Sequence, residues 1–209
     1  MHRLRTPFRI IRADLRAYLA LNAILYGLCL AGFGLALAFP QLTAGRVASL
    51  EDDGTGDLVR SLLGNVWLFA VAILGVNTLQ FGLLSLVLPS LIVPFAGIAI
   101  AAYRSFEIGV TLAPTTDAAW MTLIPHSLTW LIEFQAYVLL ALGAYIVARS
   151  WIRPQTIGAD TRRQGYVRGL KQLGRLSIPA MGLLVVGAVY EAFSLIYIVA
   201  PLAYRLTGG

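Results

Sequence analysis

Residues 61–103 contain no Asp, Glu, Lys, Arg or His over 43 consecutive positions. As one helix this run would extend about 65 Å at ~1.5 Å per residue. That is about twice the ~30 Å hydrocarbon core of a bilayer. Prolines at 89 and 94 lie in the stretch LPSLIVPF (88–95), where proline favours a turn. The run therefore predicts two membrane-spanning helices joined by a tight connection.

The rest of the chain repeats this pattern. It is 58% hydrophobic and 12% charged, with a mean hydropathy of +0.77, and soluble domains carry roughly twice that charged fraction. Residues 17–39 add 23 positions without a charge, enough for one span. We expect an all-α fold, a polytopic transmembrane helical bundle that forms one integral membrane domain over residues 1–209. The expected spans, about five, are 17–39, 65–87, 94–113, 125–148 and 176–204.

A cleaved signal peptide is the alternative explanation for the first span. Its start is basic, as signal peptides are, and Pro40 follows small residues. The apolar run is longer than the 7–15 residues of a typical signal peptide core. We favour an uncleaved first span.

The positive charges predict the orientation. Of the 16 basic residues, 12 lie in two segments, 3–16 before the first span and 149–175 between the fourth and fifth. Acidic residues gather in the loop 51–57. Because basic loops stay in the cytoplasm, we expect a cytoplasmic N-terminus and an external C-terminus.

The same placement argues against nucleic acid as a partner, although the net charge is +6. Basic residues that flank spans ordinarily contact anionic lipid headgroups, so membrane lipid is the expected partner. Val167, Leu170 and Leu173 share one face of segment 161–175. This pattern predicts an amphipathic helix along the cytoplasmic interface.

Polar residues inside the predicted spans are the candidate functional residues. They are Asn77, Gln80, Arg104, Glu107, His126, Glu133 and Glu191. A charge in mid-bilayer costs at least ~2.5–3.5 kcal/mol, so such residues usually face the bundle interior and pair. We expect one inward-facing polar cluster. It would serve either as a proton or ion relay or as a device that fixes helix register.

Arg104 is the only permanent positive charge among these residues. Glu107 lies three positions further on, a spacing that allows an ion pair along one helix. If the cluster closes, Glu133 and Glu191 would reach Arg104 from neighbouring spans. The sequence therefore predicts Arg104 as the central residue of the cluster.

Small residues recur at every fourth position of the third predicted span. They are Gly97, Ala101, Ser105 and Gly109. This spacing lets helix backbones approach closely in lipid. It predicts either helix packing within one subunit or the contact of a homodimer.

Catalytic and metal-binding signatures are missing from the sequence. It has no H-E-x-x-H or G-x-S-x-G motif, and Cys29 is its single cysteine. These motifs carry metal-assisted and nucleophilic catalysis. We expect a non-enzymatic protein without catalytic residues, metal or cofactor.

Three stretches together resemble the stage II sporulation protein M family. PHSLTWLIEFQAYVLLALGAYI (125–146) is similar to its Pro-His segment followed by Glu and Ala, and GAVYEAFSLIYIVAPL (187–202) to its closing span, with Glu191 at the family's glutamate. Residues 74–109 resemble its Asn-containing span and the span after it. Two departures stand out: Arg104 and Ser105 replace the family's Asn-Gly, and about three extra residues separate His126 from Glu133.

The resemblance implies a multi-pass protein of a bacterial or archaeal membrane that anchors envelope-associated partners as a scaffold. In spore formers those partners degrade peptidoglycan, but members also occur where no spores form. The alternative function is a transporter or channel component, such as a membrane subunit beside an ATP-driven exporter. The two functions require different arrangements of the polar residues. Transport needs them to line one continuous, water-accessible path, whereas a scaffold needs only a cluster whose hydrogen bonds are satisfied.

Overall fold

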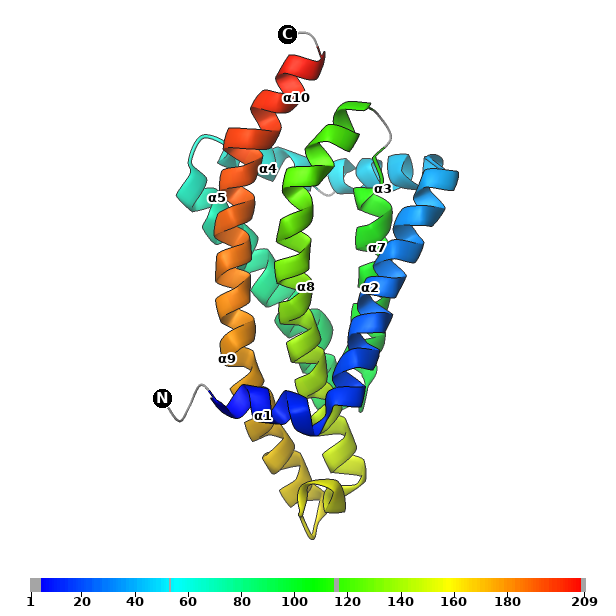
Figure 1. Ribbon diagram of the computed structural model, residues 1–209, viewed down its shortest axis with the longest axis vertical. Helices are drawn as coiled ribbons and strands as arrows, with labels where there is room; N and C mark the ends of the chain where they lie inside the picture. The colour runs from blue at the N-terminus through cyan, green and yellow to red at the C-terminus, as the bar shows by residue number, and fades with distance from the viewer. Residues whose placement is uncertain (1–4, 53, 115–116, 208–209) are drawn as a thin grey trace.

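The computed structural model describes residues 5–52, 54–114 and 117–207. Figure 1 shows a bundle of long helices with short helices across its two ends. Within the described residues every element is helical, which confirms the all-α prediction. In order, the elements are α1 (Arg5–Ala13), α2 (Leu15–Ala38), α3 (Gln41–Asp52), α4 (Thr55–Leu62), α5 (Val66–Gly75), η1 (Val76–Val87), α6 (Leu88–Ile92), α7 (Ala96–Leu112), α8 (Asp117–Ile152), η2 (Pro154–Ile157), α9 (Arg162–Ser194), η3 (Leu195–Val199) and α10 (Ala200–Thr207).

Four helices of the described chain are long and apolar enough to cross a membrane. They are Leu15–Ala38, Val66–Ile92, Ser127–Ile152 and Arg162–Leu202. The remaining predicted span, 94–113, is the shorter helix α7 of 17 residues. Helix α7 packs along α2, so it belongs to the bundle (Figure 1).

The second long helix is continuous through α5, η1 and α6, and η1 is π-helical over 12 residues. The predicted turn at 88–95 is therefore shorter than expected, because the helix continues past Pro89 as far as Ile92. The reversal falls at Val93 and Phe95. Phe95 has a φ of 68°, a left-handed conformation that is uncommon outside glycine.

The prediction of a separate interfacial helix over 161–175 is wrong. This segment is the first part of α9, and Thr161 caps it by accepting a hydrogen bond from the Gln164 backbone N–H at 3.3 Å. Gly165 and Gly169 are buried against the end of α8 around Ser150. This close backbone packing favours an upright hairpin of α8 and α9 over a helix lying on the surface. In Figure 1 it is α1 that runs across the bundle at the same end.

Helix α8 forms the centre of the bundle. Its apolar window is 78% buried, against 17–28% for the other three long helices. From 136 to 148 every residue except the half-buried Tyr145 is buried. The core is therefore built around α8, and the outer helices keep an apolar face toward the surroundings.

The small residues predicted in the third span are all buried inside the chain. Gly97 packs against the backbone of Leu86, Gly109 against that of Cys29, and on the facing helix Gly32 against that of Phe106. Ala101 and Ser105 are also buried. These small residues therefore make contacts between helices of one subunit. A homodimer would have to form through other surfaces.

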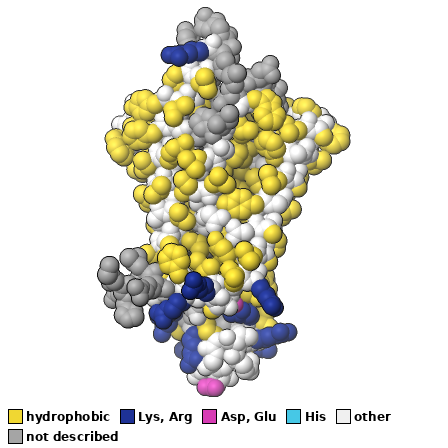
Figure 2. Space-filling model, viewed as in Figure 1, with side chains coloured by type: hydrophobic (Ala, Val, Ile, Leu, Met, Phe, Trp, Pro, Cys, Tyr) yellow, Lys and Arg dark blue, Asp and Glu magenta, His cyan; other side chains and the backbone are white. Residues whose placement is uncertain are grey.

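Charge and apolar surface separate along the molecule. Figure 2 shows a broad hydrophobic belt in the middle and most Lys and Arg side chains at one end. Helix α1 and the tip of the α8–α9 hairpin lie at this basic end, and α3, α4 and α10 lie at the other (Figure 1). This arrangement suits a bundle whose belt contacts lipid.

Candidate functional site

Glu133 on α8 is the most deeply buried carboxyl group among the predicted residues. Its exposed fraction is 8%. The Asn77 side-chain amide donates a hydrogen bond to Glu133 Oε1 at 2.6 Å. Gly187 of α9 leaves room for the Glu133 side chain, since a Cβ there would lie 2.8 Å from Glu133 Cγ. Three helical segments, η1, α8 and α9, thus meet at this carboxyl group.

Glu191 reaches the same place from α9. Its side chain is hydrogen bonded to that of Glu133. Two adjacent carboxylates repel each other strongly in a low-dielectric interior, so a pair that shares one proton is the favoured state. This arrangement also removes one negative charge from the membrane interior. The first site is therefore an Asn77–Glu133–Glu191 cluster.

Two buried hydroxyl groups lie on the same helices. Thr129 precedes Glu133 by one turn of α8, and Ser194 follows Glu191 by nearly one turn of α9. Their exposed fractions are 0% and 1%, and their hydroxyl oxygens have no hydrogen-bond partner within the described part of the chain. The polar character of this region therefore continues toward the end that carries α10.

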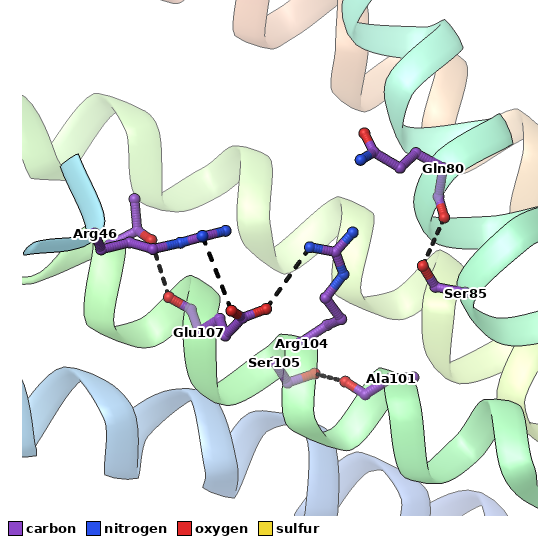
Figure 3. Close-up of polar contacts among 8 residues, drawn as sticks. Arg46, Gln80, Ser85, Ala101, Arg104, Ser105 and Glu107 are labelled. Carbon is purple, nitrogen blue, oxygen red and sulfur yellow. Dashed lines mark hydrogen bonds and ion pairs between the residues drawn. The ribbon is translucent and has the colours of Figure 1, made fainter. Parts of the chain in front are cut away.

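Arg104 and Glu107 belong to a second, separate site. Arg104 Nη1 lies 3.6 Å from Glu107 Oε2, and Arg46 Nη1 of α3 lies 3.9 Å from Glu107 Oε1. Figure 3 shows the Glu107 carboxylate between the two guanidinium groups. The predicted partner Glu107 is thus in place. Glu133 and Glu191 instead bond to each other, so the structure has two clusters where the sequence predicts one.

The remaining predicted residues lie outside both clusters. Gln80 is exposed on η1, and its backbone carbonyl accepts a hydrogen bond from the Ser85 hydroxyl at 2.7 Å (Figure 3). A bond across five residues fits the wide turn of η1. His126 lies in α8, but its side chain is outside the described residues.

A third polar network was not predicted. Gln135 of α8 accepts a hydrogen bond from the Tyr18 hydroxyl and donates to Asn22 Oδ1, both at 2.8 Å. It also donates to the Tyr26 hydroxyl at 3.0 Å. The signal was present, because Asn22 and Gln135 both fall within predicted spans. Their uncharged amides need hydrogen-bond partners in lipid, as those of Asn77 and Gln80 do.

An ion pair ties the basic end together. Arg149 of α8 forms a bidentate pair with Asp14, with the second contact from Nη2 to Oδ2 at 3.1 Å. The Arg149 guanidinium carbon also lies 5.3 Å from the centre of the Tyr145 ring. Such forked Arg–carboxylate pairs are among the stronger charged contacts. This pair fixes the start of α2 against α8.

The chemistry of these sites is that of hydrogen-bonded helix contacts. Among the described residues no three His, Cys, Asp or Glu side chains come together as metal ligands would. Comparison with protein families, curated proteins and solved structures gives no match. The argument about function therefore rests on the sequence and the structure.

Proposed function

We propose that this chain is a non-enzymatic multi-pass membrane protein that acts as a scaffold or assembly subunit for envelope-associated partners. The resemblance of three stretches to the stage II sporulation protein M family supports this role. In this proposal α7 is the fifth span, because 17 helical residues rise about 25 Å and lie within the range of transmembrane lengths. The N-terminus is then cytoplasmic and the C-terminus external.

The packing below Glu133 is the observation that carries the proposal. Toward the basic end, α8 and α9 pack closely: Gly143 faces Leu173, and Gly169 faces Val147 and the Ser150 hydroxyl. The residues of α8 in this stretch are almost all buried. This contact lies between the Asn77–Glu133–Glu191 cluster and the basic end, whereas a transport path needs continuity from one end to the other. This favours a rigid framework over a conduit.

The hydrogen-bonded Glu133–Glu191 pair favours the second candidate, a transport component. Buried carboxyl groups that share a proton are typical of proton relays. A relay also needs exchange with water on both sides. Because α8 and α9 pack closely toward the basic end, we favour the scaffold role over transport.

The proposed topology predicts which positions are accessible from outside the cell. In a Cys29→Ala background, Ser61→Cys on α4 should react with a membrane-impermeant maleimide in intact cells. Gln155→Cys at the hairpin tip should react only after lysis, because the basic end stays inside. Both residues are exposed, so accessibility of the side chain does not differ. The reverse labelling pattern would refute the orientation.

The proposed role predicts no ion flux and a defined contact surface. Proteoliposomes of the wild type should pass protons no faster than vesicles of the Glu133→Gln variant. A photocrosslinker at Gln155, on the hairpin tip, should give discrete heteromeric products in native membranes. The matched position Ile178, 70% exposed on the belt of α9, should not. Flux that is lost in Glu133→Gln would instead establish transport.

A further inference from the structure

A cleft of about 380 Å³ lies between α2, α3 and α7, at the end opposite the basic end. Its walls combine apolar and charged side chains. The residues that define it are Leu35, Leu42, Phe106, Val110, Arg46 and Glu107. Leu35 and Leu42 are 41% and 39% exposed, so the apolar wall is open to the surroundings. A cleft of this kind offers one charged contact beside a surface suited to hydrocarbon.

The charges around this cleft are unbalanced. Arg46 and Arg104 share one carboxylate, that of Glu107, which leaves one net positive charge (Figure 3). The two N–O distances, 3.9 and 3.6 Å, exceed those of a charge-assisted hydrogen bond, ~2.7–2.9 Å. The Nε–H of Arg46 is buried and has no hydrogen-bond partner among the described residues. The Arg46 side chain as a whole is 27% exposed and lines the cleft, so a ligand in the cleft can contact it.

We propose that this cleft binds one anionic phospholipid, with Arg46 contacting its phosphate and the apolar wall contacting an acyl chain. A guanidinium presents several N–H donors that match phosphate oxygens. Tyr103 is 63% exposed at the same cleft and extends the surface that faces lipid. Free phosphate would leave the apolar wall unused, whereas a phospholipid uses both parts. The proposal requires membrane insertion but does not depend on the scaffold role.

The direct test is binding of added lipid to the purified protein, measured by native mass spectrometry in detergent. The wild type should retain one phosphatidylglycerol more tightly than phosphatidylcholine or inorganic phosphate. Arg46→Gln should weaken phosphatidylglycerol binding about fivefold, as expected when one interfacial arginine contributes about 1 kcal/mol. Arg60→Gln is the matched control, because Arg60 lies at the same end but pairs with Asp57 at 2.7 Å on the exposed helix α4. Its binding should equal that of the wild type.

Glu107→Gln separates a lipid site from an ion pair that only supports the fold. It removes the carboxylate that competes for both guanidinium groups, so phosphatidylglycerol should bind more tightly than in the wild type. This variant also serves if Arg46→Gln does not fold. Unchanged binding in both variants, or equal binding of phosphatidylcholine, would overturn the proposal. Tight binding of inorganic phosphate alone would also overturn it, in favour of an anion site.

Discussion

Gly32→Ala should destabilise the protein by about 2–3 kcal/mol, the cost typical of overpacking a close contact. The new Cβ would lie 2.2 Å from the Phe106 backbone carbonyl oxygen of α7. A carbonyl within a helix cannot rotate away, so α2 and α7 would have to separate. Unfolding by SDS titration in mixed micelles measures the change. We expect the loss even though Ala is intrinsically the better helix former.

Gly34→Ala is the matched control for this prediction. It lies two residues further along α2, is exposed, and has no atom within 4 Å of its added Cβ. This variant should be neutral or more stable by up to ~1 kcal/mol. If Gly32→Ala instead alters only the oligomeric state, Gly32 faces another subunit and the α2–α7 contact described above is wrong.

The fold could be predicted from the sequence to the level of its long helices. Uncharged runs identify spans because a bilayer leaves few alternatives to a helix. The course of residues 161–175 could not be predicted in this way. Its arginines and spaced leucines fit an interfacial helix, but Gly165 and Gly169 give it a close contact with α8. That contact depends on the tertiary fold, which local periodicity does not contain.

The sequence predicted which residues form the candidate site, but not which of them contact one another. The i, i+3 pair of Arg104 and Glu107 follows from helix geometry alone and is present at 3.6 Å. Arg46 escaped attention because it lies outside the predicted spans, in the loop that forms α3. Whether Glu133 meets Arg104 or Glu191 depends on how the helices are rotated in the bundle, which the sequence leaves open.

Glu133→Leu should cost about 2–4 kcal/mol of unfolding free energy in the same SDS titration. It removes the acceptor of the Asn77 amide and the carboxyl partner of Glu191, and buried groups without partners cost about 1–3 kcal/mol each. Glu133→Gln should stay within about 1 kcal/mol of the wild type, because its carbonyl can accept from Asn77 and its amide can donate to Glu191. Gln80→Leu, an exposed polar residue on the same helix as Asn77, should cost nothing.

The double variant Glu133→Leu with Asn77→Leu tests whether the bond itself is responsible. Removing both partners leaves no unpaired amide, so the double variant should recover about 1 kcal/mol relative to the sum of the single changes. Strict additivity would show that Asn77 and Glu133 act independently. If Glu133→Leu leaves stability unchanged, the carboxyl group must be hydrated rather than enclosed by η1, α8 and α9. Water at Glu133 would supply the access that the closed packing denies, and the transport alternative would then be favoured over the scaffold.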